Sequence, residues 1–240
     1  MPPPERVDPD RRQEIRERED EEEMRSSTRE FDDRTDAGRQ LAALLRPLAE
    51  EDVVVLGIPR GGVEVAAVVA DELGAPLDVV IPKKVGAPNN PELGLGAIAE
   101  GVEVLDPSLI EALGVSREYL SAEIAREQDE IRRRSEAYRG GRPPADLDGK
   151  VAVVVDDGVA TGGTAVAALR WARLRGAARV VLAVPVAPAE GLERLRVEAD
   201  EVVVLFAPRL FYAVGQWYAD FPQVSDRRVV ELLARGGPSS

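Results

Sequence analysis

The chain of 240 residues contains neither cysteine nor histidine. Their absence excludes disulfide bonds, thiol nucleophiles, zinc sites built from these residues, and acid–base catalysis by imidazole. Any chemistry must therefore use carboxylates, cations, hydroxyls or backbone groups. Magnesium is the metal that suits such oxygen-rich surroundings.

Long apolar runs are also missing, as is a recognisable secretion signal, so we expect a cytoplasmic protein with no membrane contact. The formal net charge is −13 and the sequence pI is about 4.7. Nucleic acids and anionic membranes would be repelled by such a chain. We therefore expect small-molecule partners and no nucleic acid.

The charge is concentrated at the amino-terminal end. Residues 1–36 contain fourteen acidic residues and eight arginines, too many for a segment that buries a core. We predict a tail over 1–36 that is disordered or forms a solvated helix. A single folded domain is expected over 37–235 and a short carboxyl-terminal tail over 236–240.

The apolar pattern of the remaining chain predicts an α/β fold. Core-seeking runs at 53–57, 78–82, 151–155, 179–186 and 201–206 read as buried strands, and amphipathic segments stand between them. Strand, helix, strand is the repeating unit of a parallel sheet. We predict an open, mostly parallel five-stranded sheet with helices on both faces.

The most informative stretch is VAVVVDDGVATGGTA, residues 151–165. A buried strand ends in two acids, and a loop of small and hydroxyl residues then opens a helix. Free backbone N–H groups, two hydroxyls and the positive end of the helix dipole together form a phosphate cradle. The adjacent carboxylates suit sugar hydroxyls or a magnesium ion, so a sugar phosphate fits both halves. The candidate residues are Asp156, Asp157, Gly158, Val159, Ala160, Thr161, Gly162, Gly163 and Thr164.

Residues 151–165 also have simpler structural interpretations. Asp-Gly is a common turn dipeptide, and a strand-to-helix turn favours glycine without any ligand. The stretch is neither a Walker loop, because the lysine and the spacing are missing, nor the dinucleotide-binding glycine pattern. A magnesium phosphotransferase would use the acid pair but leaves the T-G-G-T loop without a purpose.

The stretch 151–165 resembles the phosphoribosyl-pyrophosphate motif of type I phosphoribosyltransferases. The resemblance covers about 31–235 and is closest to a bacterial group of such proteins, which shares DAGRQLA, PELGLGAIAEG and AVGQWYADFPQVSD. It implies a parallel sheet of order 3-2-1-4-5, a small hood with a flexible loop, and a homodimer. The strands that precede residues 60 and 156 would then be neighbours.

Arg60, Gly61 and Gly62 follow the first strand, at the sheet edge where ligands of such folds bind. They suit either an anion site or a tight turn with a surface arginine. The resemblance favours the first alternative, because this position matches the family's pyrophosphate loop. It further implies a cis peptide bond between Pro59 and Arg60.

Only three lysines occur among the 31 basic residues, and two of them are adjacent, Lys83 and Lys84. They open the segment 82–96, which is rich in proline, asparagine and glycine and predicts a mobile loop. The pair is either solvated or reserved for an anionic ligand. The resemblance implies that 86–96 closes over the pyrophosphate, with Lys84 as the stronger candidate because relatives often carry arginine at the position of Lys83.

Aromatic residues are scarce, and six of the ten lie between Phe206 and Phe221. Phe206 and Phe221 are expected to close the core. Phe211, Tyr212 and Trp217 are the candidates for stacking on a flat acceptor.

The resemblance implies Mg²⁺-dependent transfer of phosphoribose from phosphoribosyl pyrophosphate to a nucleobase-like acceptor, with release of pyrophosphate. Magnesium would lie near the acid pair, coordinated by ribose hydroxyls and pyrophosphate. The implied catalytic residues are Asp156, Asp157, Lys84 and Arg60. The alternative is a regulator that binds phosphoribosyl pyrophosphate without chemistry.

Overall fold

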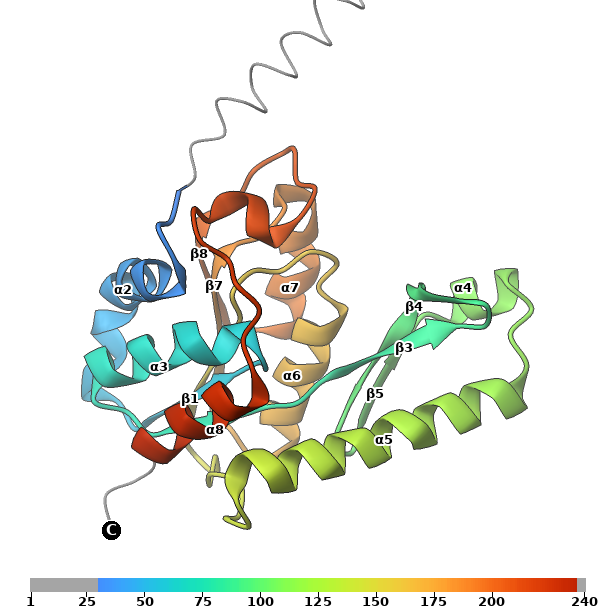
Figure 1. The fold of residues 1–240 in the computed structure, drawn as a ribbon, viewed down its shortest axis with the longest axis horizontal. Helices are drawn as coiled ribbons and strands as arrows, with labels where there is room; N and C mark the ends of the chain where they lie inside the picture. Colours follow the sequence, from blue (N-terminus) through green and yellow to red (C-terminus); the bar gives the residue numbers. More distant parts are fainter. Residues whose placement is uncertain (1–29, 237–240) are drawn as a thin grey trace, which may run out of the picture.

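The computed structural model describes residues 30–236, and its centre is a five-stranded parallel sheet (Figure 1). The spatial order is β2-β1-β6-β7-β8. The strands are β1 (Val53–Gly57), β2 (Leu77–Val79), β6 (Val151–Val155), β7 (Arg179–Val186) and β8 (Glu201–Phe206). The predicted open α/β sheet is therefore confirmed.

The predicted strand order 3-2-1-4-5 is wrong. Counted along the chain, the parallel strands lie in the order 2-1-3-4-5. The reason is that the chain leaves β2 for a separate small sheet instead of adding a third strand beyond it. The predicted neighbours are nevertheless correct, because β1 pairs with β6 from Val53 opposite Val151 to Gly57 opposite Val155.

Helices cover both faces of the sheet (Figure 1). In β1, Val53 and Val55 pack into one apolar cluster, while Val54 and Leu56 pack into another on the opposite face. The first cluster includes α2 (Arg34–Leu45), α3 (Gly61–Leu73) and α8 (Asp226–Arg235), and the second includes α6 (Gly163–Leu174) and α7 (Leu192–Glu198). Three short 3₁₀ helices complete this part: η1 (Arg46–Glu50), η2 (Ala189–Gly191) and η3 (Val214–Trp217). Burial on both faces explains why the strand sequences are continuously apolar.

The segment that was predicted as a mobile loop, 82–96, forms β-structure instead. It contributes β3 (Lys83–Ala87) and most of β4 (Asn90–Ala99), which pair antiparallel, and β5 (Val102–Leu105) completes the small sheet. The register shifts on both sides of Gly86, and Asn89 in the turn has a positive φ. Such bulges tolerate glycine and proline, which are uncommon in regular strands. These residues are the reason that the sequence predicted a loop. A turn at Glu100 and Gly101 joins β4 to β5.

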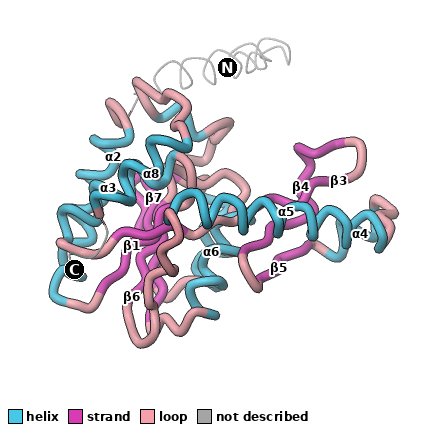
Figure 2. Tube along the Cα trace, turned by 60° about the horizontal axis from the view of Figure 1, so that its bottom comes forward, coloured by secondary structure: helices cyan, strands magenta, loops and turns pink. Residues whose placement is uncertain are grey.

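Two helices brace the small sheet. The short α4 (Pro107–Ala112) is capped by Asp106, and the long α5 (Arg117–Arg139) begins after Ser116 and ends at Gly140. Figure 2 shows α5 running from the body of the domain out along β3 and β4. The Tyr119 hydroxyl donates a hydrogen bond of 3.1 Å to the carbonyl of Gly86. The small sheet is therefore attached to α5 along its length.

The amino-terminal boundary of the domain was predicted too late. Phe31 is fully buried against Phe206 and Tyr218, and Asp33 caps α2, which starts at Arg34. Residues 31–36 are thus part of the packed domain. Although the preceding sequence is highly charged, Phe31 packs into the core and Asp33 caps α2. Residues 1–29 of the predicted tail over 1–36, and residues 237–240, lie outside the described residues. Between residues 30 and 236, no helix has both the length and the apolar composition to span a bilayer.

Candidate functional site

The acidic pair lies beside Gly61 and Gly62, the first residues of α3, at the carboxyl ends of β1 and β6. A β-carbon on Gly61 would lie 1.8 Å from Oδ2 of Asp157, and one on Gly62 would lie 2.7 Å from the α-carbon of Asp156. Both contacts are too short for a side chain. The two loops therefore touch, as their predicted neighbourhood requires, and the glycines make room for the carboxylates.

The two carboxylates have different surroundings. Oδ1 of Asp156 accepts a hydrogen bond of 2.9 Å from the backbone N–H of Asp157, whereas Oδ2 of Asp157 accepts one of 2.8 Å from Nε of Arg34. Burial raises the pKa of the Asp156 carboxyl well above its usual range, and the charge of Asp157 raises it further. Burial also raises the pKa of Asp157, but the Arg34 cation opposes that shift. Asp157 therefore has a cationic partner, Arg34. Asp156 has none of its own, and the negative charge of Asp157 opposes its ionisation.

The predicted phosphate loop lies at the amino-terminal end of α6. Gly162 precedes the helix with a φ of 78°, a left-handed conformation that favours glycine. The first N–H groups of a helix have no partner within it and attract anions. Thr161, Gly163 and Thr164 line a cavity of 130 Å³. Loop and helix together therefore present the donors that a phosphate needs.

The other wall of this cavity comes from distant parts of the chain. Lys84 and Gly94 of the small sheet line it, as does Arg194 of α7. The close fit of Lys84 is visible at Gly94, where a β-carbon would lie 2.6 Å from Cε of the lysine. The structure thus places one of the two predicted lysines beside the phosphate loop.

Lys83 has a different position. Its Nζ lies 3.2 Å from Oε2 of Glu127, a buried side chain of α5. Neighbouring residues of a strand point to opposite sides, so the pair cannot act together on one ligand. Lys83 fixes the small sheet to α5, while Lys84 lines the cavity.

Arg60 follows the predicted cis peptide bond with Pro59, which the structure contains. Its guanidinium is half-exposed and lies 4.0 Å from Oδ1 of Asp226 in α8. In this arrangement Arg60 is directed to α8, and the residues that line the 130 Å³ cavity within the described chain include neither it nor the acidic pair. A contact between Arg60 and pyrophosphate stays a prediction.

The three candidate stacking residues do not form one surface. The rings of Phe211 and Trp217 stack on each other with centroids 6.5 Å apart, and Trp217 is buried. Tyr212 is 69% exposed. Phe206 and Phe221 pack against the cluster of Phe31 and Tyr218, as their predicted core role requires. An acceptor that stacks on these aromatics would meet Tyr212 most readily.

Three residues near the site were missed in the sequence. Arg34 was assigned to the tail, Arg194 stands in an ordinary amphipathic helix, and Tyr218 was not among the aromatic candidates. The Tyr218 hydroxyl donates a hydrogen bond of 2.6 Å to the Asp157 carbonyl. Asp33 as a helix cap before DAGRQLA was the available signal that the fold includes Arg34.

A direct metal site of several protein ligands is not present in the described part of the chain, since no group of three or more acidic side chains is suitably arranged there. The adjacent carboxylates, one of them resisting ionisation, suit hydroxyl donors or a nearby cation. These residues fit an ion that is coordinated by substrate oxygens. They do not fit one held by the protein alone.

A larger cavity of 440 Å³ lies elsewhere, among Val54, Leu77, Arg139, Pro143 and Lys150. Val54 and Leu77 are near the amino-terminal ends of their strands, and Lys150 precedes β6. Ligands of open α/β sheets bind at the carboxyl ends. The smaller cavity at the phosphate loop is therefore the better candidate.

Comparisons with known proteins agree with this geometry. A family model described as "Phosphoribosyl transferase domain" matches residues 30–207. Protein Rv0571c of Mycobacterium tuberculosis, provisionally named a phosphoribosyl transferase, is 50% identical over 206 residues, which cover 85% of this chain and 46% of the relative. The chain thus spans about half the length of that relative.

Two further comparisons cover more of the matched protein. A uracil phosphoribosyltransferase of Kineococcus radiotolerans is 32% identical over 68% of this chain and 67% of its own length. The crystal structure of TT1426 from Thermus thermophilus is 49% identical, with a TM-score of 0.74, over 87% of this chain and 99% of that one. By motif, fold and sequence match, the chain belongs to the phosphoribosyltransferase family.

Proposed function

We propose that the chain transfers phosphoribose from phosphoribosyl pyrophosphate to a nucleobase-like acceptor and releases pyrophosphate. The observation that carries this proposal is the cavity in which Thr161, Gly163 and Thr164, at the start of α6, face Lys84 from the small sheet. One anion-binding wall is made of backbone and hydroxyl donors, and the other carries an ammonium group. A sugar that bears phosphates at both ends needs two such groups of donors.

The 5′-phosphate binds to the backbone of residues 160–164 and to the hydroxyls of Thr161 and Thr164. Several N–H groups converging on one anion supply most of this affinity, because the helix dipole contributes only about 0.3–1 kcal/mol. The pyrophosphate meets Lys84 and the backbone of the glycine turn at Gly61 and Gly62. Arg194, at the rim of the same cavity, adds positive charge.

Asp156 and Asp157 accept hydrogen bonds from the ribose 2′- and 3′-hydroxyls. The sugar gains positive charge as its bond to pyrophosphate lengthens, and a carboxylate beside it stabilises that charge. Lys84 stabilises the departing anion at the same moment. Segment 86–96 of the small sheet covers the ligand and excludes water, which would otherwise hydrolyse the sugar.

Asp156 and Asp157 would lie beside magnesium when it is bound, and the ion would supply positive charge that neutralises the leaving group. The protein's part is to present the hydroxyls in a fixed orientation through Asp156 and Asp157. A homodimer and the absence of a nucleic-acid partner remain predictions from the resemblance and the charge.

Pyrophosphate release tests the proposal. The full chain is incubated with phosphoribosyl pyrophosphate, Mg²⁺ and each of a panel of nucleobases, beginning with uracil because of the Kineococcus relative. We expect release that depends on one acceptor and on protein concentration. Tight binding of phosphoribosyl pyrophosphate without release for any acceptor would instead establish the regulator, and no binding would refute both.

A further inference from the structure

Arg34 lies deeply buried beside the acidic pair, although its sequence position is 123 residues away. Its side chain is only 7% exposed. Nε donates to Oδ2 of Asp157 at 2.8 Å, and Nη1 donates to the carbonyl of Pro222, also at 2.8 Å. The guanidinium carbon lies 3.8 Å from the centre of the Phe221 ring. These contacts with Asp157, Pro222 and Phe221 fix the orientation of the Arg34 guanidinium.

The neighbouring loop leaves space for this ion pair. A β-carbon on Gly61 would lie 1.8 Å from Oδ2 of Asp157 and 2.9 Å from Nε of Arg34. Any side chain at residue 61 would therefore displace the two atoms that form the hydrogen bond. The absence of a side chain at Gly61 serves the Arg34–Asp157 pair as well as access for an anion.

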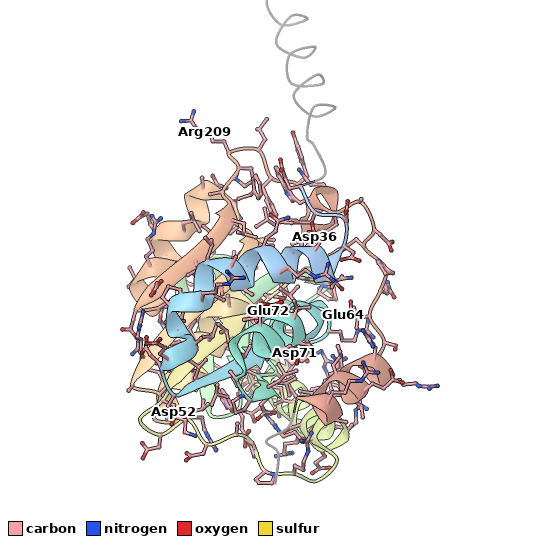
Figure 3. All side chains as sticks on the ribbon, turned by 90° about the vertical axis from the view of Figure 1, so that its left-hand side faces the viewer. Asp36, Asp52, Glu64, Asp71, Glu72 and Arg209 are labelled. Carbon is pink, nitrogen blue, oxygen red and sulfur yellow. The ribbon has the colours of Figure 1, made fainter. Side chains whose placement is uncertain are left out.

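Few charged or titratable groups lie near the Arg34–Asp157 ion pair in the described part of the chain. Asp156 is adjacent, and the Tyr218 hydroxyl contacts the Asp157 backbone. On the outer side, Glu64 of α3 lies 3.9 Å from Arg34. It also accepts a hydrogen bond of 3.2 Å from Arg228 of α8. Figure 3 shows Asp36 and Glu64 at the same end of α2 and α3, the end where Arg34 enters. Arg34 is the cation in contact with a carboxylate of the acidic pair among residues 30–236.

We propose that Arg34 is a positioning residue of the phosphoribosyl site: it keeps Asp157 ionised and in one orientation, so that this carboxylate accepts a ribose hydroxyl. Without that cation, the pKa of Asp157 would rise further, because two adjacent and poorly hydrated carboxylates oppose each other's ionisation. The proposal depends on the proposed function for its ligand. The ion pair itself can be tested without one.

The test compares wild type with Arg34→Gln and Arg34→Lys. Carboxyl ¹³C NMR of the ligand-free protein follows the titration of Asp157, and calorimetry measures phosphoribosyl pyrophosphate affinity from pH 5.5 to 8.5. In Arg34→Gln we expect Asp157 to titrate at higher pH and affinity at acidic pH to fall by at least about tenfold more than in wild type, one pKa unit being a factor of ten. Lysine should restore most of the profile, because it keeps the charge.

Arg228→Gln is the matched control, since it contacts Glu64 on the same side but not the acidic pair. Its pH profile should follow that of wild type. An unchanged Asp157 titration in Arg34→Gln, or a loss of affinity equal at every pH, overturns the proposal. If wild type binds no phosphoribosyl pyrophosphate while Asp157 still titrates differently in the variant, the proposed function fails and the ion-pair role stands.

Should Arg34→Gln not fold, the double variant Arg34→Gln with Asp157→Asn decides the question. It removes both charges of the pair. Recovery of folding shows that the single variant failed because Asp157 lost its cation, as proposed. Continued failure shows that Arg34 serves packing against Phe221 and Pro222 instead, and overturns the proposal.

Discussion

The substitution Asp156→Asn slows phosphoribosyl transfer by about 10²–10³-fold and makes the protein more stable at neutral pH. The amide keeps an oxygen that can accept the N–H of Asp157, so the local structure is retained. It cannot ionise as the sugar develops positive charge, whereas the Asp156 carboxyl can, and we therefore expect this loss in kcat. Pyrophosphate release in Asp156→Asn measures this loss.

The gain in stability follows from the raised pKa of Asp156. In the folded state burial and the charge of Asp157 hold the proton more tightly than in the unfolded chain. The free energy of unfolding therefore falls as pH rises from the ordinary aspartate range toward the raised folded pKa. Asparagine removes that decline. We expect Tm at pH 8 to rise by roughly 2–4 °C, the shift that about 1 kcal/mol gives in a domain of this size.

Asp129→Asn is the control, because Asp129 is an exposed carboxylate of α5 that pairs with Arg132. It should alter neither activity nor the dependence of Tm on pH. An Asp156→Asn protein with wild-type turnover would remove this carboxylate from the mechanism. One that is less stable than wild type at pH 8 would contradict the electrostatic account.

Methionine at position 84 lowers the affinity for phosphoribosyl pyrophosphate by roughly 10–100-fold. Lys84 is the lysine that lines the cavity with Thr161 and Thr164, and a hydrogen bond to a charged group contributes about 1.5–3 kcal/mol. Calorimetric titration of phosphoribosyl pyrophosphate into Lys84→Met provides the measurement. Tm should change little, because the side chain lies at a cavity wall.

Lys83→Met provides the contrast. It removes one of the two cations that pair with buried Glu127 in α5, the other being Arg126, so we expect a lower Tm and a smaller loss of affinity. Lys150→Met, before β6, is a control for general loss of positive charge. Equal losses of affinity in the Lys83 and Lys84 variants would contradict this division of roles, in which Lys83 stabilises the fold and Lys84 binds the ligand.

The sheet and its helices were predictable because their signals are local. The five apolar runs needed burial on both faces, and Asp106, Ser116 and Gly140 mark helix ends by the chemistry of their own caps. The spacing from Asp156 to Thr164 fixes the order of strand, acid pair and helix. The strand order depended on where the chain goes after β2, which no local signal specifies.

The remaining predictions failed where contacts between distant parts of the chain determine the local structure. Residues 82–96 became strands because they pair with one another and pack on α5, against the local preference of glycine and proline. Phe31 and Arg34 stand among charged residues, yet each finds its partners in the carboxyl-terminal half of the chain. Lys83 and Lys84 are alike in the sequence, and only the side of β3 on which each lies separates them.

A crystal structure with phosphoribosyl pyrophosphate and Mg²⁺ tests the central claim most directly. The account predicts the 5′-phosphate within hydrogen-bond distance of the backbone of residues 161–164, the ribose hydroxyls at Asp156 and Asp157, and pyrophosphate beside Lys84. Ligand bound in the 440 Å³ cavity at Arg139 and Lys150 instead, with the phosphate loop empty, would contradict it.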